Sequence, residues 1–270
     1  MSESGIPAGR STGPRTPVAH SARVWNYWAG GQDNYEVDER VGASVAAMFP
    51  VIREVALANR AFLGRAVGFL AAERGTRQFL DIGTGLPASE NTHEMAQRVD
   101  PGARVVYVDN DPLVLMYARA LLTGTGEGAT DCVEADVRDP DTVIERAATT
   151  LDLSRPVAVL MLGILNFVLD GGEARDIVRR VMAAVPSGSH LVLTHPTDEP
   201  ELGGVGQRAA MTYWNAHARP AITARGRAEI EGLFEGLELL EPGLVSCSAW
   251  RADGQAAPVV PQLAAVAVKP

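Results

Sequence analysis

The chain has 270 residues, enough for one large domain or two small ones, and its 46% hydrophobic content can supply a buried core. Its formal net charge of −9 argues against a nucleic-acid partner, because binding a phosphate backbone normally requires a cationic surface. The two cysteines, Cys132 and Cys247, are too few for a disulfide framework and lack the short spacing of metal ligands. We therefore expect a soluble globule of the reducing cytoplasm, without a metal site.

The N-terminal quarter predicts a tail followed by a helical cap. Residues 1–19 are rich in Ser, Gly and Pro and contain no apolar run, so we expect a disordered tail rather than a signal peptide. No window of the chain has an uninterrupted apolar run near twenty residues, which argues against a membrane span. Residues 20–75 then predict the cap or lid, with helices over Ser21–Ala29, Tyr35–Phe49 and Ile52–Arg74.

Residues 76–270 predict a single domain in which short apolar runs alternate with helical stretches. The predicted strands are Gln78–Ile82, Arg104–Asp109, Thr130–Glu134, Val157–Leu162 and His190–Thr194. The predicted helices between them are Ala88–Val99, Pro112–Leu122, Pro140–Thr149 and Glu173–Val185. This alternation is typical of βαβ units, because parallel neighbours need crossover connections.

The C-terminal part departs from this pattern. Glu201–Arg219 and Thr223–Phe234 predict helices, and Leu237–Val245 and Leu263–Val268 predict an antiparallel strand pair at one edge of the sheet. The predicted fold class is therefore α/β: a Rossmann-like, doubly wound, mostly parallel sheet of seven strands with an antiparallel C-terminal edge pair and an N-terminal helical cap.

Three successive strand ends carry polar or glycine residues of a kind that binds nucleotides. Asp81 precedes Gly83-Thr84-Gly85, and Asp109-Asn110 and Asp136-Val137 follow at the next two strand ends. In an open parallel sheet ligands bind at the carboxyl ends of the strands, where a carboxylate can accept the hydroxyls of a ribose. Taken singly, each group has a simpler explanation as a tight turn, a helix cap or a loop carboxylate. Their order along the chain favours a ligand.

The residues after the glycines indicate which ligand. A dinucleotide fingerprint has a third glycine where this chain has Pro87, and a phosphate-binding loop of the Walker type has a lysine that is absent here. Glu90 and Glu94 lie near the start of the predicted helix and would repel a diphosphate. These features suit S-adenosylmethionine, which has a sulfonium and an amino-acid tail but no phosphate.

The chain resembles the class I S-adenosylmethionine-dependent methyltransferases, and more narrowly an actinobacterial family of methyltransferases with little assigned chemistry. The resemblance covers nearly everything after the tail and rests on five segments: residues 21–34 (SARVWNYWAGGQDN), 58–63 (ANRAFL), 79–87 (FLDIGTGLP), 106–112 (VYVDNDP) and 133–139 (VEADVRD). By this resemblance, Asp81, Gly83, Thr84 and Gly85 hold the amino-acid end of the cofactor, Asp109 the ribose, Asn110 the adenosine edge, Asp136 and Val137 the adenine, and Leu162 and Gly163 the pocket floor. Pro87 departs from the family's usual third glycine.

The cap contributes further candidates. Tyr27, Asn34 and Tyr35 belong to an aromatic and glycine-rich run that suits a lid over the substrate pocket, although the same aromatics would equally attach a helix to the core. Arg60 is a candidate for binding a carboxylate, either that of the cofactor or that of a structural partner such as Asp33.

The sequence indicates the site of the methyl acceptor less clearly than that of the cofactor. Asn166 and Phe167 follow the fourth strand and are placed to line the acceptor pocket, and Tyr213 and Trp214 form its far wall or belong to the core. The Asn-Pro-Pro signature of amino-group methylation is absent. His195 is the candidate base for a hydroxyl acceptor, although a lone histidine is more often structural.

Three functions remain open on the sequence alone. The first is methyl transfer to a small-molecule acceptor, for example a hydroxyl of a secondary metabolite. The second is a non-catalytic protein that binds S-adenosylmethionine and regulates a partner, since no acceptor-activating residue is evident. The third and weakest is a nicotinamide-dependent oxidoreductase, against which Pro87 and the acidic helix start count.

Overall fold

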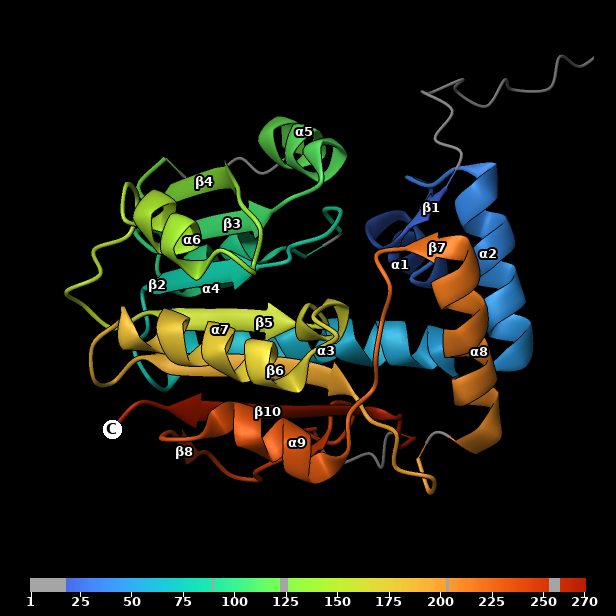
Figure 1. The fold of residues 1–270 in the computed structure, drawn as a ribbon. Coiled ribbons are helices and arrows are strands. Elements are labelled where there is room, and N and C mark those ends of the chain that lie inside the picture. Colours follow the sequence, from blue (N-terminus) through green and yellow to red (C-terminus); the bar gives the residue numbers. More distant parts are fainter. Residues whose placement is uncertain (1–17, 89, 122–125, 203, 253–257) are drawn as a thin grey trace, which may run out of the picture.

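The computed structural model describes residues 18–88, 90–121, 126–202, 204–252 and 258–270. Almost all of the predicted tail, residues 1–17, lies outside them. Within the described residues a twisted sheet lies between two layers of helices, as predicted (Figure 1). The strand order is β4-β3-β2-β5-β6-β10-β8, with β9 pairing beside β8 along β10. The strands are β2 (Gln78–Ile82), β3 (Arg104–Asp109), β4 (Ala129–Glu134), β5 (Ala158–Leu162), β6 (His190–Pro196), β8 (Glu238–Leu239), β9 (Val245–Ser246) and β10 (Gln262–Val268).

The first five strands of this sheet are parallel and β10 is antiparallel to β6. Their side chains alternate between two hydrophobic cores, because neighbouring residues of a strand point to opposite faces. Phe79 belongs to the core on one face, and Leu80 to the core on the other. Both faces are covered by helices, so the strands are apolar nearly throughout.

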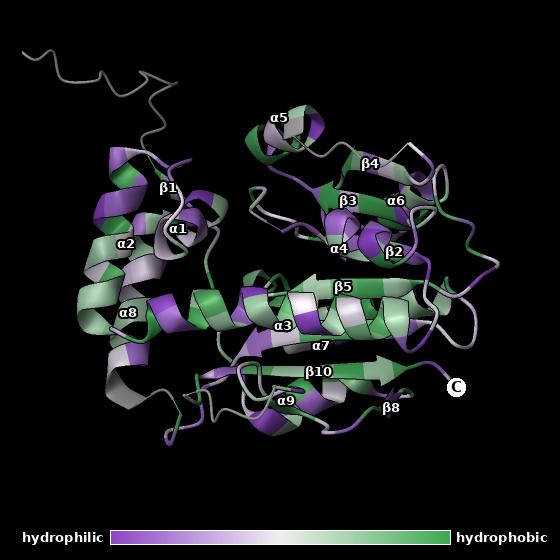
Figure 2. Ribbon diagram, turned by 180° about the vertical axis from the view of Figure 1, so that it is seen from behind, coloured by the Kyte–Doolittle hydropathy of each residue, from purple (hydrophilic) through white to green (hydrophobic). Residues whose placement is uncertain are grey.

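Helices α3, α4 and α5 contribute to one core, and α6, α7 and α9 to the other. Figure 2 shows the first face, where α3 crosses in front of β5. The helices of the domain are α3 (Ile52–Ala72), α4 (Thr92–Val99), α5 (Pro112–Leu121), α6 (Pro140–Ala147), α7 (Gly171–Ala183) and α9 (Arg227–Glu231), with short 3-10 turns η1 (Leu165–Phe167) and η2 (Gly232–Phe234).

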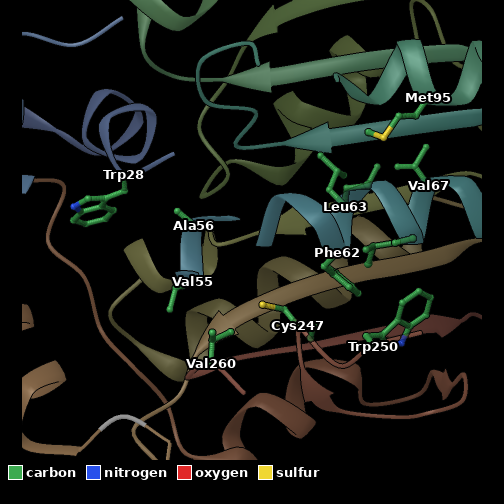
Figure 3. Close-up of a cluster of buried hydrophobic side chains, with 14 of the residues drawn as sticks. Trp28, Val55, Ala56, Phe62, Leu63, Val67, Met95, Cys247, Trp250 and Val260 are labelled. Carbon is green, nitrogen blue, oxygen red and sulfur yellow. The ribbon is translucent and has the colours of Figure 1, made fainter. Parts of the chain in front are cut away.

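Helix α3 joins the cap to the domain. It is the one described helix long and apolar enough by composition to cross a membrane, but half of its most apolar window is buried inside the protein. Phe62 packs edge-on against Trp250, with ring centroids 5.3 Å apart (Figure 3). Leu63 and Val67 lie nearer Met95 of α4 in the same view. We therefore regard α3 as a core helix.

The cap lies at the carboxyl ends of the parallel strands (Figure 1). It consists of α1 (Ser21–Trp28), α2 (Glu36–Met48), α8 (Gly204–His217) and a two-stranded sheet in which β1 (Ala19–His20) runs parallel to β7 (Ala218–Arg219). The sequence did not predict this sheet, because a pair of two-residue strands has no periodicity to detect. The pairing brings together segments about two hundred residues apart and closes the cap over the sheet.

Three predicted elements were wrong in detail. The predicted strand Leu237–Val245 is split into β8 and β9 by a turn at Gly243, whose φ is 82°. The predicted antiparallel edge is confirmed, because both short strands pair antiparallel with β10, which lies between them and β6. The helix predicted over Thr223–Phe234 begins only at Arg227, because the backbone of Thr223 and Arg225 is bonded to Asn166 and Pro196 instead. Helix α4 begins at Thr92 rather than at Ala88.

Candidate functional site

A cavity of about 830 Å³ lies between the carboxyl ends of the parallel strands and the cap. It brings together most of the residues predicted at the strand ends. Those that line it are Arg60, Gly83, Thr84, Gly85, Asp109, Asn110, Asp136, Val137, Leu162, Gly163 and Phe167. They come from α3 and from the ends of β2, β3, β4 and β5, since parallel strands deliver their carboxyl ends to one edge.

The structure favours glycine at positions 83 and 85, after β2, for different reasons. Both have a positive φ, 78° at Gly83 and 65° at Gly85, which favours glycine. A Cβ at Gly83 would lie 2.6 Å from Cδ1 of Ile164, so this glycine lets Ile164 pack against the loop. A Cβ at Gly85 would meet nothing within 4 Å. Of these two glycines, only Gly85 has open space where a side chain would lie.

Asp109 is held by the backbone around it. Its Oδ2 accepts from Gly85 N at 3.0 Å and its Oδ1 from Asp111 N at 2.9 Å. Burial raises the pKa of the Asp109 carboxyl above its ordinary value, and these two hydrogen bonds oppose that rise. Each carboxylate oxygen keeps further lone pairs, so the group can still accept from a ligand hydroxyl.

Asn110 and Asp136 meet across neighbouring strand ends. Asn110 Nδ2 donates to Asp136 Oδ2 at 3.0 Å, and Asp136 Oδ1 accepts from Arg138 N at 2.9 Å. Val137, which is buried, follows Asp136 directly. The pair therefore offers a polar edge beside an apolar surface, which suits a flat heteroaromatic ring.

Asp81 lies behind the cavity rather than among the residues that line it. It is buried, and its Oδ2 accepts from Thr92 Oγ1 at 2.6 Å. Burial raises the pKa of this carboxyl to about 6, while the Thr92 hydroxyl and the nearby Arg60 charge lower it. Asp81 thus ties the glycine loop to the first turn of α4.

Arg60 lines the cavity, and its positive charge attracts the carboxylate of Asp81. Its guanidinium donates to the carbonyl of Glu90 and to Asn91 Oδ1 at 3.3 Å, and not to the predicted structural partner Asp33. Burial lowers the pKa of Arg60, although a guanidinium remains charged at neutral pH. The side chain is therefore a cation at the glycine-loop end of the cavity.

The two acids after Pro87 are engaged in the structure of α4. Glu94 accepts from Asn91 N at 2.7 Å in a capping box, and Glu90 pairs with Arg98 at 2.8 Å. Neither lines the cavity. The two acids therefore act on the cavity only through their charge, which also reaches Arg60, and Asn91 rather than Ala88 caps the helix.

The cap lines the cavity with different residues from those predicted. Tyr27, Asn34 and Tyr35 are absent from its lining. Arg53 lies over the Tyr27 ring and Arg23 over the Tyr35 ring, while Asn34 Nδ2 donates to Asn26 Oδ1 at 3.0 Å. These three side chains are therefore engaged in contacts within the cap and with α3. The cavity is lined instead by Ser21, Ala22, Trp25, Asn26, Gly30 and Asp33.

His195 does not reach the cavity. β6 extends two residues beyond the predicted strand, because Leu263 and Gln262 continue its pairing, and this places His195 inside the sheet with no exposed surface. Nδ1 donates to Pro196 O at 2.8 Å and Nε2 accepts from Arg225 at 2.5 Å. Burial lowers the pKa of the imidazole to about 4. With both nitrogens engaged, His195 is not available as a base for a ligand.

The four residues predicted to surround the acceptor do not line one common cavity. Asn166, Phe167 and Trp214 line a second, smaller cavity between the cap and η1, and Phe167 also lines the large one. Tyr213 lines neither and stacks on His217, with ring centroids 4.1 Å apart. Adjacent residues of a helix point about 100° apart, so Tyr213 and Trp214 do not share a surface.

The sequence analysis also missed His20, Asn59 and Arg219 as residues that line the large cavity. Asn59 belongs to a segment already noted for its resemblance. His20 and Arg219 had no signal, because only the pairing of β1 with β7 brings them to the site. His20 Nδ1 lies 3.0 Å from Asp111 Oδ2. Among the described residues no group of three or more His, Cys, Asp or Glu is arranged to hold a metal ion.

Comparison with known proteins identifies the family. No curated protein matches the chain. A DUF574 family protein from Streptomyces avermitilis is 44% identical, with a TM-score of 0.89 over 94% of this chain and 99% of the other. A candidate methyltransferase from Thermobifida fusca is 36% identical, with a TM-score of 0.86 over 93% and 95%. Residues 10–270 match the S-adenosyl methyltransferase family. The chain therefore belongs to this family, and its cofactor is S-adenosylmethionine.

Proposed function

We propose that this S-adenosylmethionine-dependent methyltransferase acts on a small-molecule acceptor, for example a hydroxyl of a secondary metabolite. The observation that carries the proposal is the position of the large cavity beneath the cap. Its lining includes cap residues 20–33 on one side, the strand ends on another, and Arg219-Pro220 on a third. A site closed in this way suits a small ligand better than a folded polymer.

The residues present fit the cofactor. Gly85 leaves open main chain, Arg60 offers a cation for a carboxylate, and Asp109 offers acceptors for ribose hydroxyls. Asp136 and Val137 offer an acceptor and an apolar surface for the adenine. We propose these roles for the five residues, together with Thr84, Asn110, Leu162 and Gly163, which line the same cavity. Asp81 acts through Thr92 and the loop rather than by contact.

The cofactor supplies a methyl group on a positively charged sulfur. The chain's own part is to bind and orient both reactants and to exclude water, which can supply much of the rate of an in-line displacement. We propose that residues 20–48 of the predicted cap act as the lid in this sense, whereas α3, which makes up most of the rest of residues 20–75, belongs to the core. With His195 buried, the lining includes one described histidine, His20, as a candidate proton acceptor.

Family membership favours the methyltransferase over the other two hypotheses. It gives no support to a nicotinamide-dependent oxidoreductase, and it supports catalysis rather than cofactor sensing alone. We also propose a cytoplasmic location, which the two free thiols Cys132 and Cys247 support, since oxidising compartments favour disulfides.

The cofactor site is tested by calorimetry with S-adenosylhomocysteine. We expect binding by the wild type and at least a tenfold higher Kd for Asp109→Ala, because a charge-assisted hydrogen bond to the ribose is lost. Asp176→Ala is the matched control, since Asp176 lies on the exposed face of α7 and pairs only with Arg179 among the contacts described. Equal Kd values for all three proteins would contradict the assignment of Asp109.

The acceptor is sought by incubating the wild type with methyl-labelled S-adenosylmethionine and fractionated small-molecule extracts. We expect label in a low-molecular-weight fraction, and less label with Asp109→Ala at the same cofactor concentration, chosen below the Kd of this variant. Label that enters only protein or nucleic acid would overturn the small-molecule proposal.

A further inference from the structure

The second cavity, of about 70 Å³, shares two walls with the large one. Trp25 and Phe167 line both. The remaining walls come mainly from α1, α2, α3 and α8 and from the ends of β6 and β10. We call it the aromatic chamber, after the rings among its lining residues: Trp25, Trp28, Phe49, Phe167 and Trp214.

The indole rings of the chamber are held in place. Trp28 Nε1 donates to Gly42 O at 3.0 Å and Trp214 Nε1 donates to Pro220 O at 2.8 Å. The Trp28 ring centroid lies 5.7 Å from that of Trp25 and 5.9 Å from that of Trp214. Because their donors are already used, Trp28 and Trp214 present hydrocarbon surface to a ligand. Fixed aromatic rings give contact area at a low entropic cost.

One side-chain oxygen of the chamber is fully buried without a hydrogen-bond partner among the described residues. Asn166 is 5% exposed, and its Oδ1 is buried without a partner. The neighbouring Gln262 Nε2 donates elsewhere, to Thr194 Oγ1 at 3.1 Å, and Thr194 donates to Asn59 Oδ1 at 2.7 Å. A buried acceptor left without a donor costs free energy, so its presence points to a ligand that supplies one.

We propose that the aromatic chamber binds the edge of an aromatic ring of the methyl acceptor, and that a hydroxyl or amine on this ring donates to Asn166 Oδ1. The inference rests on the proposed function. The acceptor is neutral at this ring, since none of the described residues lining the chamber is charged. An apolar cavity of about 150 Å³ admits a whole benzene ring, so this chamber takes part of one and the rest lies in the large cavity.

The geometry also gives the ring its position. Asn166 Oδ1 would lie 3.8 Å from a Cβ built on Gly163, and Gly163 lines the large cavity at the end of β5. The glycine therefore leaves a gap through which a ligand in the large cavity reaches the amide. Asn166 is a binding and positioning residue here, because an amide does not take up a proton at neutral pH.

The test measures binding of four probes by equilibrium dialysis to the full chain saturated with S-adenosylhomocysteine. The probes are 2-naphthol, 2-naphthylamine, naphthalene and the saturated alcohol 2-decalol. We expect 2-naphthol or 2-naphthylamine to bind most tightly, which also distinguishes a hydroxyl from an amine. Naphthalene should bind roughly tenfold more weakly because it makes no hydrogen bond, and 2-decalol more weakly still because it is not planar.

Variants then distinguish the contribution of the aromatic chamber to binding from that of the Asn166 amide. Asn166→Leu should weaken the better donor probe roughly tenfold and leave naphthalene unchanged. Ala210→Leu, which adds volume to the chamber wall, should weaken all aromatic probes. Thr212→Ala is the control, because Thr212 is exposed on the same helix and bonds only to Arg208 O among the contacts described. An unchanged Kd for S-adenosylhomocysteine shows that each variant has folded.

Two results would overturn the inference while leaving the proposed function intact. One is that the protein binds S-adenosylhomocysteine normally but binds 2-naphthol and 2-naphthylamine no more tightly than 2-decalol. The other is an equal effect of Asn166→Leu on naphthalene and on the donor probes. Failure of the wild type to bind S-adenosylhomocysteine would instead contradict the cofactor site itself.

Discussion

Asp81 shows how a single buried carboxyl supports the site without lining it. The residue ends β2 and receives a hydrogen bond from Thr92 in the first turn of α4. Its charge is costly in this position, since burial is the main cause of its raised pKa. The nearby cation of Arg60 offsets part of this cost.

We expect this carboxyl to make stability depend on pH. Its pKa is 3.8 in the unfolded chain and about 6 in the folded one. The folded chain therefore binds the proton more tightly, so the stabilisation is complete below pH 4 and is lost as the pH rises through 6. A difference of roughly two pKa units corresponds to about 3 kcal/mol, as an upper estimate.

Urea unfolding of the wild type and of Asp81→Asn at pH 4, 5, 6 and 7.5 measures this dependence. The amide does not titrate. The unfolding free energy of the wild type should therefore fall relative to that of Asp81→Asn as the pH rises from 4 to 6. Parallel pH curves for the two proteins would mean that Asp81 keeps an ordinary pKa.

At the scale of elements, the cap is held together by one buried acid. Asp38 of α2 is fully buried and accepts from Arg23 Nε of α1 at 2.7 Å, from His20 N of β1 at 3.0 Å and from Tyr35 N at 3.0 Å. One side chain thus joins two helices and the strand β1. Because β1 carries His20 to the large cavity, the acid also sets one wall of the site.

We expect Asp38→Asn to destabilise the cap strongly. The change removes the carboxylate from the buried guanidinium of Arg23, and removing one partner of a buried ion pair typically costs about 3–5 kcal/mol. Denaturant unfolding measures this loss, and calorimetry with S-adenosylhomocysteine measures its effect on the site.

The matched control is Glu36→Gln on the same helix. Glu36 pairs with Arg40 at 3.2 Å, but both side chains are largely exposed, so the unfolding free energy should not change measurably. Equal effects of the two substitutions would show that the burial of Asp38 has no special importance.

At the scale of the whole molecule, the cavity depends on contacts between distant parts of the chain. β1 pairs with β7 across about two hundred residues, α2 packs on α8, and α3 runs from the cap into one of the two cores. Arg65 of α3 donates to the carbonyls of Cys247 and Trp250 at 2.6 and 2.7 Å. The cap and the sheet should therefore unfold together.

We expect one cooperative transition with coincident fluorescence and circular dichroism curves. Trp25, Trp28 and Trp214 report on the cap, whereas Trp250 reports on the core beneath α3. S-adenosylhomocysteine at one hundred times its Kd should stabilise the fold by about 2.7 kcal/mol. A separate, earlier fluorescence transition that the ligand does not shift would show that the cap folds independently of the site.

The sequence by itself determined the parallel core and the residues at its strand ends. Each apolar run and each helical period is local, and parallel strands necessarily place their carboxyl ends at one edge, so Asp109 and Asp136 were found without coordinates. Local patterns also led to errors: Ala88 was taken for a helix start, and His195 for a loop residue.

Only the tertiary structure decided what surrounds these strand ends. The β1–β7 pairing, the burial of His195 against Arg225, and the meeting of Trp25, Phe167 and Asn166 all join segments far apart in the chain. No periodicity records such contacts, because each depends on the packing of whole elements rather than on the conformation of its own segment. The strand ends proposed to bind the cofactor are therefore local in origin, and the chamber proposed to bind the acceptor is tertiary.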